Sequence, residues 1–290
     1  MIVVVVLAGG ALAAAASGRM SDRAVGDHRG SLPSALRPRM TASPNWSGYV
    51  ATAPPGKTIS YERVSGTWTV PAAVCAPGKP ETYSTVWVGL GGYTQTRQEE
   101  VGTDANCTAS GQPRYFAWFE LVPYLSYPVS IANKVAAGDT ITGVVRIVNP
   151  KLVELQLTNR TRRWTFTRRI NWAINDTSTA DWIVEAPAIC RETSCSEASL
   201  SDFRTVTMRD ISATGNGETG TLADRHWKVI PIRLIPSRMT IPVINPIAIS
   251  SGHRGKRGQA ASPAGATPSS PSTDGRSFSW QWVKVATRGI

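Results

Sequence analysis

Histidine is scarce in this chain of 290 residues, which has only His28, His226 and His253. His28 and His253 lie in stretches with little apolar pattern, so a Ser-His-Asp or Cys-His centre would depend on His226 alone. In the segment DRHWKV, that residue is better explained as a polar position of a strand. The few histidines and cysteines argue against zinc, and there is no Walker loop or dinucleotide fingerprint. We therefore expect no metal and no other cofactor.

Charge and helical periodicity are also in short supply. Charged residues make up 18% of the chain, hydrophobic residues 41%, and no long window sustains an amphipathic helix. This composition argues against a coiled coil and against disorder throughout. Gly (25), Pro (20) and Trp (10), set among many Thr, Ser and Val, indicate short strands joined by turns.

Apolar residues recur at every second position, as in strands with one buried face. In VSGTWTVP, the residues that share one face are Val64, Gly66, Trp68 and Val70; in RYFAWFELVP, Tyr115, Ala117, Phe119 and Leu121 oppose Phe116, Trp118 and Glu120. Further strands are predicted at 81–92, 97–104, 141–148, 152–158, 162–169, 180–186, 203–209, 227–234 and 277–286. This pattern predicts an all-β fold, a two-sheet antiparallel β-sandwich.

Only one long hydrophobic run is present, from Ile2 to Ala16, and it ends in small residues. It is short for a membrane span and typical of a signal peptide, so residues 1–17 are predicted to direct secretion to the extracellular space. An uncleaved or lipid-anchored segment is the alternative. Residues 18–44 are interpreted as a leader or propeptide, and 45–290 as one domain. Within that domain, 250–276, rich in Gly, Ser and Pro, are expected to form a flexible loop before the last strand.

The net charge of +11 comes mainly from the two ends of the chain, because the stretch 45–249 is close to balance. The most basic segment is RTRRWTFTRR at 160–169, which could be offered as a nucleic-acid strip. A hairpin with Trp164 and Phe166 packed inward explains it better. We expect no nucleic-acid partner, no stable membrane insertion after signal cleavage, and a monomer.

Four cysteines in an exported chain are expected to form disulfides. Cys190 and Cys195 are close enough in sequence to close a small loop, which leaves Cys75 and Cys107 as the other pair. Three connectivities are formally open, and the sequence alone does not choose among them.

The remaining chemistry is that of carboxylates and amides. Glu100 in QEEVGT, Glu120 in AWFELVP and Glu185 in DWIVEAP lie within apolar strand patterns. Burial among Trp, Ile and Val raises the pKa of a carboxyl group and suits it to proton transfer. Each could instead be a hydrogen-bonded structural acid.

Seven segments in order resemble the glutamic peptidase (eqolisin) family. They are NWSGYV at 45–50, VSGTWTVP at 64–71, STVWVGLGG at 84–92, EEVGTD at 99–104, YFAWFELVP at 115–123, AAGDTI at 136–141 and DWIVEAP at 181–187. The resemblance implies a sandwich similar to the concanavalin-like lectins, with a substrate cleft across its concave sheet. It also implies an acid-acting secreted endopeptidase that cleaves polypeptides with a Glu and a Gln.

The family's catalytic Glu maps onto Glu185, where it would activate water and protonate the leaving amine. The Gln position is occupied by Glu100, and Gln98, on the same side of its strand, is a candidate substitute. Trp87, Trp118 and Glu120 fit cleft-lining positions that would contact substrate.

Glu100 at a Gln position leaves two further interpretations. Glu100 and Glu185 could share a proton as a coupled pair, or catalysis could be lost in a lectin-like or peptide-binding sandwich. A glycoside hydrolase with paired carboxylates is a third, weaker alternative.

Overall fold

The computed structural model describes residues 4–5, 40–124, 126–130, 132–173, 175–191, 194–236, 240–242 and 264–285. Within them every regular element is a strand. The strands are β1 (Val4–Val5), β2 (Thr41–Ser43), β3 (Trp46–Thr52), β4 (Tyr61–Thr69), β5 (Thr85–Gly91), β6 (Gln98–Cys107), β7 (Pro113–Val122), β8 (Tyr127–Pro128), β9 (Thr140–Asn149), β10 (Leu152–Asn159), β11 (Trp164–Asn171), β12 (Thr179–Glu185), β13 (Ala188–Arg191), β14 (Ser194–Glu197), β15 (Thr205–Gly215), β16 (Glu218–Gly220), β17 (Lys228–Leu234), β18 (Thr240–Pro242), β19 (Ala264–Pro268) and β20 (Phe278–Lys284).

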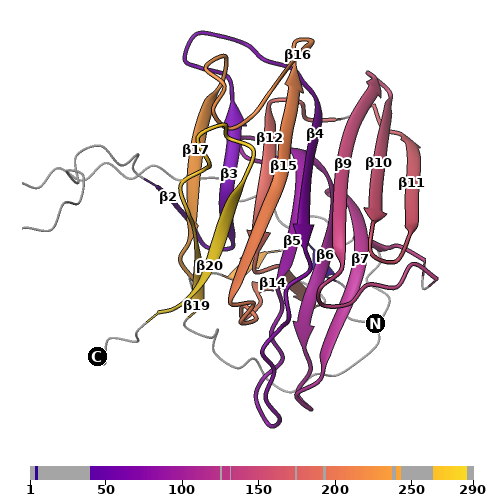
Figure 1. The fold of residues 1–290 in the computed structure, drawn as a ribbon, viewed down its shortest axis with the longest axis vertical. Coiled ribbons are helices and arrows are strands. Elements are labelled where there is room, and N and C mark those ends of the chain that lie inside the picture. Colours follow the sequence, from indigo (N-terminus) through magenta and orange to yellow (C-terminus); the bar gives the residue numbers. More distant parts are fainter. Residues whose placement is uncertain are drawn as a thin grey trace, which may run out of the picture.

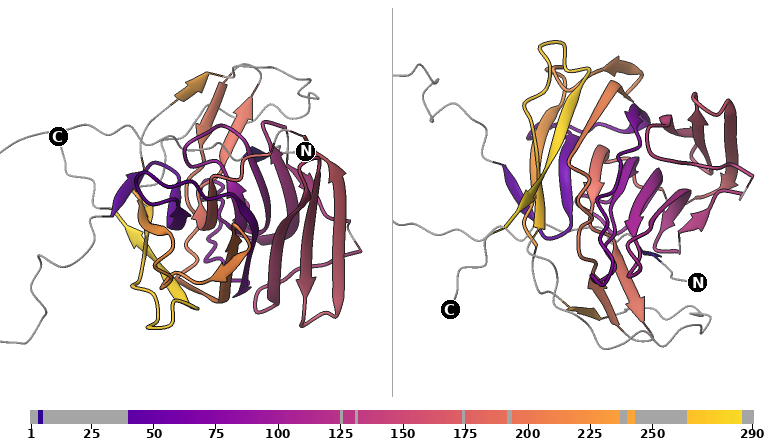
Figure 2. Two further views of the ribbon diagram at one scale, coloured as in Figure 1. Left: turned by 90° about the horizontal axis from the view of Figure 1, so that it is seen from above. Right: turned by 60° about the horizontal axis from the view of Figure 1, so that its bottom comes forward.

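Sixteen of these strands form one continuous sheet that folds back on itself into two layers (Figure 1, Figure 2). Fourteen of them follow the order β11-β10-β9-β4-β15-β20-β19-β17-β3-β12-β5-β6-β7-β8, while β16 pairs with β15 and β2 with β17 beside this path. The pairing is antiparallel except between β2 and β17. Across the layers, β4 contacts β5 and β12, while β9 contacts β5 and β6. The predicted antiparallel β-sandwich is confirmed.

Each central strand has two buried faces, and the alternation of side chains assigns residues to them. Between the layers lies the main core, which includes Trp68 and Trp182. On the opposite face of β12, β5 and β7 lies a second cluster of Trp46, Val50, Trp87, Trp118, Ile183 and Ile232. The predicted division of β7 is confirmed, since Phe119 belongs to the main core and Trp118 to the second cluster.

The expectation that 250–276 form a loop is wrong for residues 264–268, which form the buried strand β19 between β17 and β20. Apolar alternation could not reveal this strand, because its residues are small. A side chain at Gly265 would lie 2.3 Å from the backbone oxygen of Leu234, so close packing there requires glycine. Residues 250–263 lie outside the described residues.

The predicted signal peptide and leader lie mostly outside the described residues. Of the predicted signal peptide, only Val4–Val5 is described; it pairs with Ala188 and Ile189 of β13 in a separate four-stranded sheet, β1-β13-β14-β18. None of the described segments is a helix that could cross a bilayer.

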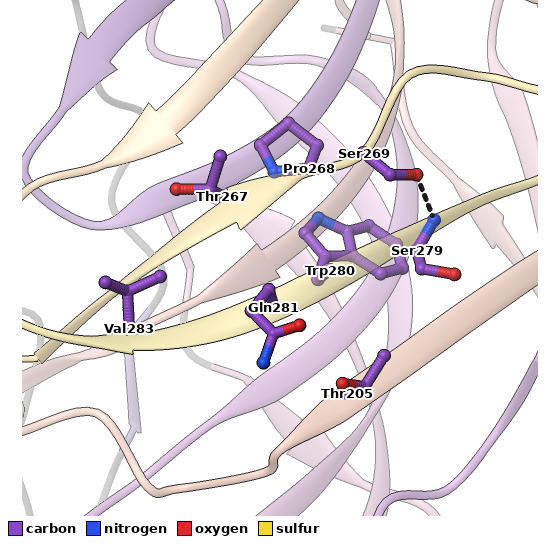
Figure 3. Close-up of a pocket in the computed structure, with 8 residues that line it drawn as sticks. All are labelled: Thr205, Thr267, Pro268, Ser269, Ser279, Trp280, Gln281 and Val283. Carbon is purple, nitrogen blue, oxygen red and sulfur yellow. Dashed lines mark hydrogen bonds between the residues drawn. The ribbon is translucent and has the colours of Figure 1, made fainter. Parts of the chain in front are cut away.

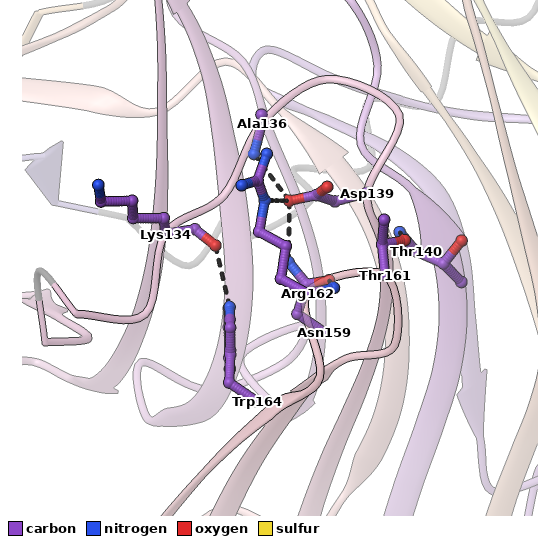
Figure 4. Close-up of polar contacts among 8 residues, drawn as sticks. All are labelled: Lys134, Ala136, Asp139, Thr140, Asn159, Thr161, Arg162 and Trp164. Carbon is purple, nitrogen blue, oxygen red and sulfur yellow. Dashed lines mark hydrogen bonds and ion pairs between the residues drawn. The ribbon is translucent and has the colours of Figure 1, made fainter.

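The basic segment forms the turn after β10 and most of β11. Trp164 and Phe166 pack against the main core, while the arginines around them are exposed, as the hairpin interpretation predicts. Arg162 has a structural partner: Asp139 accepts hydrogen bonds from its Nε (2.5 Å) and from Asn159 Nδ2 (2.9 Å) (Figure 4). The Trp164 indole donates to the backbone oxygen of Lys134 (2.9 Å).

A disulfide joins Cys75 to Cys107 at the end of β6, as predicted. Cys190 and Cys195 are directly opposite each other in the register of the β13–β14 hairpin. Their disulfide stays a prediction.

Candidate active site

Strands β12, β6 and β7 carry a group of carboxylic acids on the side of the sheet that points away from the main core. We call this side of β12, β5, β6 and β7 the acid face; β5 lies between β12 and β6 and carries no acid. The members of the acid face can be read from the strand register in transverse rows. One row is Asp181, Gly89, Glu100 and Glu120; the next is Ile183, Trp87, Gly102 and Trp118; the third is Glu185, Thr85, Asp104 and Phe116. The topology thus brings Glu185 and Glu100, far apart in sequence, onto one face, with β5 between their strands.

Glu185 is held by two hydrogen-bond donors. Its Oε1 accepts from Asn45 Nδ2 (2.9 Å), and its Oε2 accepts from the indole Nε1 of Trp87 (2.9 Å). Asn45 reaches this position because it immediately precedes β3, whose Trp46 is the register partner of Glu185. Both oxygens of Glu185 therefore have a donor suited to a negative charge.

Glu100 has the opposite environment. It is fully buried, and within the described part of the chain neither of its carboxyl oxygens has a hydrogen-bond partner. Its register partner on β5 is Gly89, which has no side chain that could donate a hydrogen bond. A Cβ at Gly89 would lie 3.1 Å from the Cβ of Glu100.

These environments act on the two pKa values in different ways. The pKa of Glu185 is raised well above its usual range by burial, and hydrogen bonds from Trp87 and Asn45 reduce this rise without cancelling it. Burial also raises the pKa of Glu100, and the carboxyl groups of Glu120 and then Glu185 raise it further. No donor opposes these effects at Glu100, so its neutral form is the favoured one.

Gln98, the candidate substitute, lies on the acid face but beyond the row of Glu100. It pairs in register with Gly91 of β5, and its side-chain amide packs on Gly92, where a Cβ would lie 2.5 Å from it. Among the acids it neighbours Asp181. In this arrangement Gln98 does not join Glu185.

The three predicted contact residues all lie on the acid face. Trp87 and Trp46 make an edge-to-face contact at 5.1 Å, and Trp118 packs over Gly102, where a Cβ would lie 2.6 Å from its ring. Glu120 is directly opposite Glu100. The resemblance leads one to expect an open cleft here, but Glu185, Glu100 and Glu120 are all 0% exposed in this structure.

Two buried acids of the same strand were not singled out from the sequence. Asp104, on the acid face, has its pKa raised to about 7 by burial. Glu99 points into the main core, where it accepts a hydrogen bond from Trp172 Nε1 (2.7 Å), and burial raises its pKa to about 8. Alternation along β6 places Asp104 on the same face as Glu100, so the sequence could have identified it. The burial of Glu99 depends on β10 and the segment after β11, which are distant in sequence.

A surface hollow of about 390 Å³ lies over β15, β19 and β20 (Figure 3). It is lined by Thr205, Thr267, Pro268, Ser269, Ser279, Trp280, Gln281 and Val283. None of these side chains is an acid or a base. This hollow therefore offers no acid–base chemistry of its own.

Comparison with known proteins identifies the relatives of this chain. The sequence profile of the Peptidase A4 family matches residues 44–236. Aspergillopepsin-2 of Aspergillus niger is 28% identical over 199 residues, a match that spans 61% of this chain and 66% of that protein, just under two thirds of its length.

Solved structures share the fold. Scytalido-glutamic peptidase, crystallised with a peptide based transition state analog, superposes with a TM-score of 0.61 at 21% identity, covering 82% of this chain and 98% of that one. SCP-B, a member of the eqolisin family in complex with the tripeptide Ala-Ile-His, gives 0.59 at 21% identity with the same coverage. The aspergilloglutamic peptidase of Aspergillus niger gives 0.51 at 22% identity, covering 70% and 99%.

Proposed function

This chain belongs to the peptidase A4 family, the eqolisins, and on that premise we propose that it hydrolyses peptide bonds with Glu185 as base and Glu100 as hydrogen-bond donor. The observation that carries the proposal is the contrast between the two acids. Glu185 accepts hydrogen bonds from Asn45 and Trp87, whereas Glu100 accepts none from the described residues. Donors favour a carboxylate and a dry site without them favours the neutral acid, so the two groups are suited to different roles.

In the first step, ionised Glu185 takes a proton from water while the water oxygen forms a bond to the carbonyl carbon of the peptide. The π electrons of the carbonyl group move to its oxygen, and neutral Glu100 donates a hydrogen bond to the resulting oxyanion. In the second step, Glu185 gives its proton to the amide nitrogen, the C–N bond breaks and the carbonyl group re-forms. A carboxylic acid and an amine leave, and both glutamates return to their starting states.

This mechanism ties activity to low pH. Glu100 can donate only while it is protonated, so activity falls as the pH rises through its pKa. Glu185 can act as base only while it is ionised, so activity also falls at the acid end. Burial and the neighbouring carboxyls raise the pKa of Glu100, which keeps it a donor to higher pH. Burial also raises the pKa of Glu185, which moves the acid limb of activity upward.

Secretion and maturation are part of the same proposal. The apolar run at 2–16 and the disulfide between Cys75 and Cys107 support export into an oxidising space. Since Glu185 and Glu100 are buried in this structure, we expect a substrate to reach them only after rearrangement, and we expect the leader 18–44 to be removed. An active secreted protein whose N-terminus lies at Ser17 or nearby would contradict that removal.

The second candidate function is peptide binding without cleavage, and Glu100 itself favours it. An ionised Glu100 would offer no donor and would repel the oxyanion. Loss of one such donor typically costs on the order of 100- to 1000-fold in rate.

Proteolysis of acid-denatured casein between acid and neutral pH separates the two functions. We expect the wild-type protein to cleave in acid and Glu185→Gln to lose at least about a thousandfold, because a neutral amide cannot accept the proton of water. Glu62→Gln, at an exposed position of β4 outside the acid face, is the matched control and should cleave like wild type. Cleavage by Glu185→Gln at the wild-type rate would remove Glu185 from the mechanism. Saturable casein binding by wild type, without cleavage at any pH, would support the binding function instead.

A further inference from the structure

Glu120 is the acid directly opposite Glu100 in the strand register. The two residues are register partners on adjacent antiparallel strands, β7 and β6, and both lie on the acid face. Directly opposite residues of such strands have Cβ atoms about 4.5–5.5 Å apart. Both side chains are 0% exposed, so water does not screen one carboxyl from the other.

Among the described residues of β12, β5, β6 and β7, Glu100 faces no cation. The ionisable residues that face Glu100 are all acids: Glu120 from β7, Asp181 and Glu185 from β12, and Asp104 from its own strand; β5 contributes none. The first basic residue on this face of the four strands is Arg114, six residues from Glu120 along β7, which is about 20 Å at ordinary strand rise.

Two carboxylates in such a place cannot easily be ionised together. When two acids interact strongly, their protons leave in two separated steps, so the pair retains one proton over a wide range of pH. An arrangement of this kind holds a proton at an active site without a metal or a base.

We infer that Glu120 is a positioning residue that acts through Glu100, retaining a proton on the pair so that Glu100 remains a neutral hydrogen-bond donor. The inference rests on the proposed function for its role in catalysis, but the proton-retaining pair itself is a property of the fold. It explains how a glutamate can work at a position where the resembling family has glutamine. Repulsion between the two carboxyl groups keeps Glu100 neutral, whereas the amide of a glutamine is neutral at every pH.

The test is the pH profile of kcat in four proteins: wild type, Glu120→Gln, Glu100→Gln and the double variant. We expect Glu120→Gln to move the alkaline limb of kcat to lower pH by about one unit or more, because Glu100 then ionises more easily. In the Glu100→Gln background the same change should move no limb, since residue 100 no longer titrates. Asp181→Asn is the matched control: it lies in the same row, but its effect on the pKa of Glu100 is smaller.

A direct titration keeps the inference testable whether or not the protein cleaves peptides. With glutamate labelled at the side-chain carboxyl carbon, the NMR signal lost in Glu100→Gln identifies residue 100. Its titration midpoint in wild type should fall by about one pH unit in Glu120→Gln, and in Glu120→Met should Glu120→Gln not fold. An unchanged midpoint, or an alkaline limb that moves equally with Gln at position 100, would overturn the inference. Absence of proteolysis with the midpoint shift present would instead refute the proposed function and leave the pair standing.

Discussion

The hydrogen bond from Trp87 to Glu185 gives the most quantitative prediction. Its donor and acceptor are 2.9 Å apart, and both residues are 0% exposed. A hydrogen bond to a charged group contributes about 1.5–3 kcal/mol. Because one pKa unit corresponds to about 1.4 kcal/mol, Trp87→Phe should raise the pKa of Glu185 by about one to two units.

The sign follows from the role of Glu185 as base. A higher pKa means that less of the residue is ionised in acid, so the acid limb of kcat/KM should move to higher pH by the same one to two units, roughly. Peptide cleavage measured across the acid range gives this limb directly. Trp182→Phe is the control, because its indole donates to the backbone oxygen of Ser65 (2.9 Å) and faces the main core. An unmoved acid limb in Trp87→Phe, or an equal movement in Trp182→Phe, would refute the reasoning.

Three predictions concern the fold. Burial raises the pKa of Glu99 to about 8 and of Asp104 to about 7, so the folded protein holds protons that the unfolded chain releases above a pH of about 4. The free energy of unfolding should therefore fall as the pH rises from about 4 to about 8. Urea titrations should show this decline, and Glu99→Gln should make it less steep. Gly102→Ala should lower the thermal midpoint, because its Cβ would lie 2.6 Å from the Trp118 ring and 2.8 Å from the Cβ of Trp87. Gly56→Ala is the control: its Cβ would meet open space, so only the positive φ of this position should lower the free energy of unfolding, by about 1 kcal/mol. Removing both Cys75 and Cys107, which are 32 residues apart, should cost about 2–5 kcal/mol in denaturant unfolding, and an unchanged midpoint would contradict a structural role for the bond.

Alternation along single strands accounts for the part of the site that could be predicted from sequence. Period two correctly separates Trp118 and Glu120 from Phe119, and it places Glu185 on the side of β12 that carries Ile183. Each strand's own pattern fixes which of its residues share a face. Resemblance then selected Glu185 from the three candidate acids.

The partners across strands could not be predicted in the same way. The hydrogen bond from Asn45 to Glu185 joins residues 140 positions apart, and the pairing of Glu100 with Glu120 depends on the register of β6 and β7. A local pattern gives a residue's side of its strand but not the residue opposite. The same reasoning explains why β19 was missed, since its small residues become buried only because β17 and β20 enclose them.

The central claim is that Glu100 works as a neutral donor beside an ionised Glu185, and the pH profile of peptide cleavage by Glu100→Gln tests it most directly. Glutamine offers a donor at every pH, so the account predicts that this variant cleaves in acid and continues to cleave at the higher pH where wild type stops. A folded Glu100→Gln protein that is inactive across the whole range would contradict the account, because it would show that residue 100 must be an acid.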